Sequence, residues 1–146
     1  MSAKYSTNDG ATWSTLTSVG SLPVRAVRRS GNYIYVGGNS DMKVSADGGA
    51  TWGTVSTGAV YDILIDNGMV YVGTTHNTTA HLRYNTLSNF TSGWGSTLID
   101  FSVSGALQKL WAFDERIFAI TPSGATSTWM SSGLGDGTWF PSTGTA

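Results

Sequence analysis

The chain has 146 residues, of which 12% are charged and 12% aromatic, and eight Lys and Arg against nine Asp and Glu give a net charge of -1. This balance excludes a basic nucleic-acid surface and a polybasic membrane arm. Cys is absent, which excludes a disulfide framework, a thiol nucleophile and a zinc-thiolate site. No run approaches the roughly 18 apolar residues of a membrane span, and the N-terminus has no apolar signal segment, so we expect no membrane insertion. The cellular location stays open.

Short alternating apolar segments, without helical spacing, begin at the N-terminus. Lys4–Ser6 and Trp13–Thr17 are the first two predicted strands, with a turn between them. A second unit starts at Val24. It passes through a turn at Ser30–Asn32 and continues with the predicted strand Tyr33–Gly37.

This second unit recurs twice along the chain. Segments aligned with Val24 begin at Val60 and Leu107, 36 and then 47 residues further on. Each unit continues with a third strand, a Trp and a Ser/Thr-rich fourth strand, and a four-strand repeat of this length is typical of one β-propeller blade. We therefore predict one all-β domain over residues 1–146, built of four-stranded antiparallel blades. Its units cover residues 4–23 (outer strands only), 24–59, 60–106 and 107–146.

Two turns before a Trp share the spacing S-x-[D/N]-x-G-x-T-W. The positions that define it are Ser6, Asn8, Gly10 and Trp13 in the first copy, and Ser45, Asp47, Gly49 and Trp52 in the second. The Asp or Asn side chain is expected to accept backbone N–H bonds within the turn, and the Gly to adopt positive φ. The Trp is expected to bury a large apolar area against the neighbouring strand.

This spacing resembles the Asp-box, or BNR repeat, of sialidase-like and other β-propellers. The resemblance is complete over Ser45–Trp52 and nearly complete over Ser6–Trp13. Asn85–Trp94 keeps only the lead-in and the Trp, and Asp136–Trp139 has altered spacing. The resemblance implies a turn between the two outer strands of a blade, at its periphery, with a structural and not a catalytic role.

The predicted strands number fourteen, or about three and a half blades, whereas closed propellers have about 4–8. The open ends are expected to be covered in one of three ways. A second copy could close a ring, the chain could dock in a larger assembly, or the N-terminal strand pair could complete the unit that begins near Leu107. We favour closure by self-association, as a homo-oligomer such as a dimer.

Residues suited to catalysis are few. A sialidase-like enzyme needs an Arg cluster with Tyr, Glu and Asp, but the aligned inner-strand position holds one Arg among Arg25, Tyr61 and Gln108. The single Glu, Glu115, falls in a predicted hairpin turn. We therefore expect no enzymatic activity and no catalytic residue.

His76 and His81 are five residues apart, but no third ligand accompanies them, so we expect no metal site and no cofactor. Both are predicted to lie in an exposed loop. Loops at 39–41, 74–79, 102–106 and 121–126 are neutral and rich in hydroxyls and amides. The candidate ligand-binding residues in or beside them are Asn39, Asp41, His76, Asn77 and His81.

Such a surface suits sugar hydroxyls or a protein partner better than phosphate. The leading hypothesis is a non-enzymatic binding or structural module that recognises glycan or protein surfaces, such as a virion, tail or lectin-like component. Two alternatives are a protein-binding assembly factor and a degenerate sialidase-like glycosidase. The low content of charged residues, 12%, counts against the assembly factor, and the single Glu counts against the glycosidase.

Overall fold

The computed structural model describes residues 4–6, 10–16, 23–89, 91–92, 94, 98–121, 128–131 and 139–141. Within these ranges, only the backbone is described at 5, 76, 98–100, 102–103, 128–131 and 139–141. The described residues form fourteen β-strands, one short 3-10 turn (Leu87–Asn89) and no α-helix. The prediction of an all-β chain of antiparallel sheets is confirmed. None of the described residues belongs to a helix long and apolar enough to cross a membrane.

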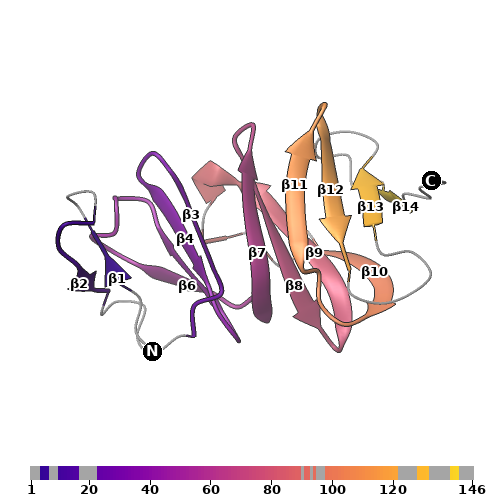
Figure 1. Cartoon of the computed structure of the whole chain (residues 1–146), viewed down its shortest axis with the longest axis horizontal. Helices are drawn as coiled ribbons and strands as arrows, with labels where there is room; N and C mark the ends of the chain where they lie inside the picture. The colour runs from indigo at the N-terminus through magenta and orange to yellow at the C-terminus, as the bar shows by residue number, and fades with distance from the viewer. Residues whose placement is uncertain are drawn as a thin grey trace.

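Four antiparallel sheets follow one another along the chain (Figure 1). The first has two strands, β1 (Lys4–Tyr5) and β2 (Ser14–Thr15). The other three are four-stranded, and in each the neighbouring strands are consecutive in the chain. Their strands are β3 (Ala26–Ser30), β4 (Tyr33–Gly37), β5 (Met42–Ser45) and β6 (Gly53–Val55); β7 (Ala59–Asp66), β8 (Met69–His76), β9 (Thr79–Thr86) and β10 (Leu98–Ser104); and β11 (Lys109–Phe113), β12 (Arg116–Ile120), β13 (Thr128–Ser131) and β14 (Trp139–Pro141).

The first strands of the three four-stranded sheets lie next to one another, because β3 contacts β7 and β7 contacts β11. One hydrophobic core fills the space between the β3–β6 and β7–β10 sheets, and includes Tyr35, Met42, Val60, Ile63 and Val72. A second core lies between the β7–β10 and β11–β14 sheets, and includes Tyr71, Leu82, Leu107, Leu110 and Ile117. The middle sheet therefore packs apolar side chains against both neighbouring sheets.

Two glycines allow the close approach of consecutive sheets. A Cβ at Gly37 would lie 2.3 Å from Val60 Cγ1, and a Cβ at Gly73 would lie 2.7 Å from the carbonyl oxygen of Leu107. These glycines occupy equivalent repeat positions, so the same close contact is made at both junctions.

The chain does not close on itself through its N-terminal strands. β12 pairs with β13, which pairs with β14, so the last four-stranded sheet is complete without β1 and β2. Figure 1 shows β1–β2 at the opposite end of the long axis from this sheet. The option in which the N-terminal pair completes the unit beginning near Leu107 is therefore wrong.

The turn that precedes Trp52 is held by its own side chains. Asp47 accepts hydrogen bonds from the Thr51 amide at 2.9 Å, from the Thr51 hydroxyl at 2.5 Å and from the Ser45 hydroxyl at 2.8 Å. Ser45 Oγ accepts from the Gly49 amide at 2.8 Å, and Gly49 has φ of +99°. The hydrogen bonds from Thr51, first, and then from Ser45 lower the pKa of Asp47 to about 2. The expected roles of Asp47 and Gly49 are confirmed.

The first copy of the turn has the same described geometry. Gly10, with φ of +88°, donates its amide to Ser6 Oγ at 2.8 Å. Asn8 lies outside the described residues, as do Asp136–Thr138 of the altered copy. The expected burial of the Trp is wrong for this copy, because Trp13 is 61% exposed while Trp52 is half-buried.

Candidate functional site

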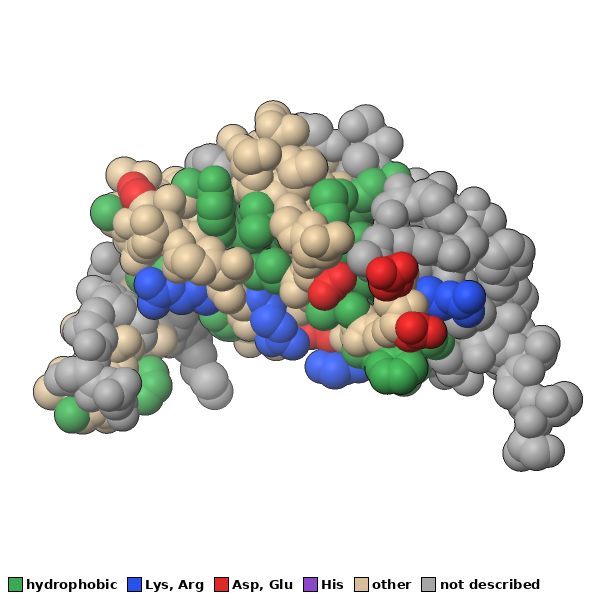
Figure 2. Space-filling view, turned by 90° about the horizontal axis from the view of Figure 1, so that it is seen from above, with side chains coloured by type: hydrophobic (Ala, Val, Ile, Leu, Met, Phe, Trp, Pro, Cys, Tyr) green, Lys and Arg blue, Asp and Glu red, His purple; other side chains and the backbone are tan. Residues whose placement is uncertain are grey.

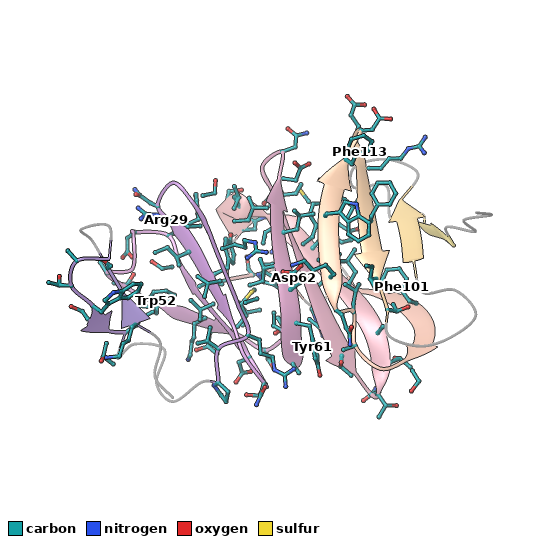
Figure 3. The ribbon with its side chains drawn as sticks, in the orientation of Figure 1. Arg29, Trp52, Tyr61, Asp62, Phe101 and Phe113 are labelled. Atoms are coloured by element: carbon teal, nitrogen blue, oxygen red, sulfur yellow. The ribbon has the colours of Figure 1, made fainter. Side chains whose placement is uncertain are left out.

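Loops from consecutive sheets meet at one edge of the molecule. The amide of Val60 donates to the carbonyl of Gly38 at 2.8 Å, which ties the start of β7 to the β4–β5 loop. In the same way, the amide of Gly105 donates to the carbonyl of Thr78 at 2.8 Å. We call this the loop edge, defined by residues 23–25, 38–41, 57–58, 77–78 and 104–108. Figure 3 shows Tyr61 near this end of β7, whereas Phe113 lies at the opposite edge.

Arg25 is held in a fixed position on the loop edge by two contacts. Its guanidinium carbon lies 4.4 Å from the centroid of the Tyr61 ring, a cation–π geometry. Its Nε donates to Asn39 Oδ1 at 2.5 Å. Tyr61 stands at a break in the β7–β8 register between Val60 and Asp62, which is consistent with a β-bulge that redirects its side chain.

The sequence aligned Arg25, Tyr61 and Gln108 at one repeat position, and the structure brings the first two into contact. Arg25 and Gln108 are exposed and Tyr61 is half-buried. The Nε of Arg25 donates to Asn39, and the exposed side chain lies on an edge that also carries hydroxyl and amide groups.

Asp62 joins the three four-stranded sheets from the middle of β7, where Figure 3 places it. Its Oδ1 lies 3.1 Å from Arg28 of β3 and accepts from the Ile63 amide at 3.0 Å. Its Oδ2 lies 3.1 Å from Lys109 Nζ and accepts from the Leu110 amide, in β11, at 3.0 Å. The carboxylate is 3% exposed, and its two oxygens are used by four donors. It is a joint between sheets, with no oxygen left over for a ligand.

Sequence reasoning did not identify this joint. The repeat alignment nevertheless contains a signal for half of it, since Asp62 and Lys109 occupy the same position in consecutive units, each one residue before an aligned apolar residue. Opposite charges at equivalent positions of adjacent strands favour an ion pair. Figure 2 shows Lys and Arg side chains spread along one side of the described residues, with Asp and Glu side chains beside them.

The candidate ligand residues Asn39 and Asp41 lie in the β4–β5 loop, as expected. Asn39 is exposed and contacts Arg25, while Asp41 is half-buried. The carbonyl of Asp41 accepts from the Gly38 amide at 3.1 Å, and its Oδ2 accepts from the Ser40 hydroxyl at 3.3 Å. Both residues therefore belong to the loop edge.

The expected loop at 74–79 is largely strand. Thr74 is buried in β8, and only Asn77 and Thr78 form the turn, with φ of +48° and +69°. Two positive-φ residues define a type I′ hairpin turn, in which a β-branched Thr is unusual. Asn77 is exposed at this turn, on the loop edge.

The expectation that both histidines lie in an exposed loop is wrong. His81 is in β9, is 3% exposed, and has Nδ1 at 3.1 Å from the carbonyl oxygen of Thr79. His76 ends β8, opposite Thr79 in the register, and its side chain lies outside the described part of the structure. Among the described residues, the loop at 102–106 is also mainly strand, since β10 extends to Ser104, and residues 122–126 are not described.

The opposite edge of the molecule has a different chemistry. Asp66, Phe113, Asp114 and Glu115 line a shallow hollow between the β7–β8 and β11–β12 hairpin tips. Glu115 lies in the hairpin turn with φ of +57°, where sequence analysis expected a turn. Across the described ranges, no three His, Asp or Glu side chains are grouped in a way that could hold a metal ion.

Comparison with known proteins adds no identification. No protein-family model and no curated protein matches this chain.

Proposed function

We propose that this chain is a non-enzymatic binding module built of β-propeller blades, and that its loop edge binds a hydroxyl-rich ligand, a glycan. Three consecutive four-stranded meanders whose first strands lie side by side support the blade interpretation. The hydrogen bonds around Asp47 support the resemblance to an Asp-box turn.

The arrangement around Arg25 carries the choice of the loop edge. Stacking on Tyr61 and the bond to Asn39 restrict the rotamers of a side chain that is otherwise costly to order. A preorganised guanidinium beside exposed amide and hydroxyl groups offers several donors to sugar oxygens. Asp41 supplies an acceptor on the same loop.

The same edge offers little for acid–base catalysis. Glycoside hydrolysis normally needs two carboxyl groups flanking the bond. Asp41 is the carboxylate among the described residues of the loop edge, and Asp62 is occupied by four donors. We therefore assign binding without turnover.

A glycan array tests this function, with wild-type protein, Arg25→Ala and the matched control Arg29→Ala. Arg29 is an exposed Arg on β3 near the opposite edge, where its Nε donates to the carbonyl of Gly31. Loss of charged hydrogen bonds to the ligand should weaken binding about tenfold or more in Arg25→Ala and leave Arg29→Ala unchanged.

Three outcomes contradict the proposal. The first is that wild-type protein binds no glycan, which would leave a protein surface as the ligand. The second is that Arg25→Ala binds as wild type does. The third is turnover of a fluorogenic glycoside that disappears in Glu115→Gln, which would indicate a glycosidase.

A further inference from the structure

The two outermost faces of the three four-stranded sheets carry the two halves of a contact that the chain already makes twice internally. From this we infer that a second copy of the chain docks head to tail, with the outer face of its β11–β12 on the outer face of β3–β4, which β1–β2 covers only in part. This inference goes beyond ligand binding and does not depend on it.

The outer face of β3–β4 is identified by comparing residues at equivalent positions of the three repeats. Val24, Val27 and Ile34 in this sheet align with Val60, Ile63 and Val70 in the next and with Leu107, Leu110 and Ile117 in the last. Val24 is 37% and Val27 is 48% exposed, whereas Val60 and Ile63 are fully buried against the preceding sheet. The β3–β4 face is therefore an apolar surface built like a buried one, and it is exposed at Val24 and Val27, while Val36 on the same face is 2% exposed.

A cavity marks the same face. It has a volume of about 420 Å³, lies between β1–β2 and the β3–β6 sheet, and is lined by Leu16, Val27, Ile34, Val36 and Trp52, among others. The strand pair β1–β2 stands in front of this face without filling the space behind it. An incoming sheet must displace this pair, which is itself only two short strands.

The outer face of β11–β12 carries the complementary half. Tyr35 of the β3–β6 sheet and Tyr71 of the β7–β10 sheet occupy equivalent positions. Each projects into the core at one of the two internal junctions, where they are 0% and 2% exposed. The corresponding residue of the last sheet is Phe118, which remains half-buried and stacks on Trp111 with ring centroids 5.4 Å apart. Phe118 thus occupies the position whose counterparts are buried by a following sheet.

One position differs from the internal junctions. Ile120 stands where Gly37 and Gly73 allow the next sheet to approach closely. The side chain of Ile120 keeps the two copies further apart than the sheets at the internal junctions, so the contact between copies resembles those junctions in its apolar residues and differs in its spacing. Because the two faces are different surfaces, the association is heterologous and forms rings or open chains.

Sedimentation velocity on the whole chain, from about 1 to about 100 μM, tests this inference. Wild type should associate with increasing concentration. Val27→Glu and Phe118→Glu should each weaken association about tenfold or more, because each places a charge in an apolar contact. Phe118→Tyr should retain association, since Tyr occupies the equivalent internal positions, and Ser88→Glu, at an exposed site in the 3-10 turn after β9 of the middle sheet, should behave as wild type.

Mixing the two Glu variants makes the test specific for a head-to-tail contact. Val27→Glu keeps an intact β11–β12 face and Phe118→Glu keeps an intact β3–β4 face, so the mixture should form a one-to-one complex that neither variant forms alone. Circular dichroism of each variant establishes that it is folded, and Trp111→Glu replaces Phe118→Glu if the latter is not. A monomeric wild type, or folded variants that fail to complement, would overturn the inference.

Discussion

Asp47 and Asp62 each accept several hydrogen bonds, yet they stabilise the chain at different scales. The side-chain donors to Asp47 belong to Ser45 and Thr51, within four residues of it. The donors to Asp62 come from β3, β7 and β11 and include Leu110, 48 residues away. The first carboxylate shapes one turn on the surface, and the second holds three sheets together from a buried position.

The largest effect should come from the buried joint. Asp62→Ala leaves the amides of Ile63 and Leu110 without their acceptor, while the heads of Arg28 and Lys109 remain partly in water. We expect a loss of about 2–4 kcal/mol in the free energy of unfolding, measured by urea denaturation. Asp66→Ala, at a hairpin tip, should change it by less than about 0.5 kcal/mol. Equal effects of the two substitutions would contradict the assigned role of Asp62.

The two Trp residues that follow the repeated turn should differ less strongly. Trp52→Ala removes a half-buried ring that also donates Nε1–H to the carbonyl of Gly49 at 2.9 Å. We expect it to cost about 1–3 kcal/mol, below the full cost of truncating a buried Trp. Trp13→Ala, at a site 61% exposed, should cost less than about 0.5 kcal/mol, with both variants measured by urea denaturation. A larger loss of unfolding free energy in Trp13→Ala than in Trp52→Ala would contradict the assignment of Trp52 as the more buried of the two rings.

Acid should weaken the turn at Asp47 more than it weakens the rest of the chain. The pKa of Asp47 is lowered from 3.8 to about 2 in the folded chain, so its contribution is fully present above pH 4 and is lost as the pH falls toward 2. The variant Asp47→Asn should therefore show a shallower fall in melting temperature between pH 4 and pH 2. Parallel curves for variant and wild type would exclude this contribution.

The smallest effect on stability should come from the buried hydroxyl of Tyr35, which, unlike the carboxylate of Asp62, accepts or donates no hydrogen bond within the described residues. The Tyr35 hydroxyl is buried with no hydrogen-bond partner among the residues that the structure describes, and burial raises the pKa of Tyr35 to about 12. Tyr35→Phe removes an unsatisfied group from the core, so the free energy of unfolding should stay the same or rise by about 1 kcal/mol. A clear loss in urea denaturation would show that the hydroxyl has a partner.

A structural feature of this chain can be predicted from the sequence when the residues that form it are close together in the sequence. The Asp47 turn lies within eight residues, and its side-chain roles were predicted from spacing alone. The exposure of Trp13 depends on which strands lie near it, which local sequence does not contain. The loop predicted at 74–79 was too long, because a β-branched Thr at positive φ departs from the usual Asn-Gly pattern of the two-residue turn at Asn77–Thr78.

The candidate site likewise combines features that local sequence predicts with one that depends on the packing of distant strands. The loop position of Asn39 and Asp41 and the alignment of Arg25 with Tyr61 were accessible from the repeat. The contact between Arg25 and Tyr61 depends on the packing of β3 against β7, and therefore emerged only from the fold.

Amide hydrogen exchange on Asp62→Ala tests most directly whether one carboxylate joins the sheets. The account predicts that the Leu110 amide, in a different sheet from residue 62, exchanges at least about tenfold faster than in wild type, while the Thr51 amide in the Asp47 turn keeps its rate. An unchanged rate at Leu110, in a variant whose Ile63 amide is deprotected, would contradict the joint between sheets.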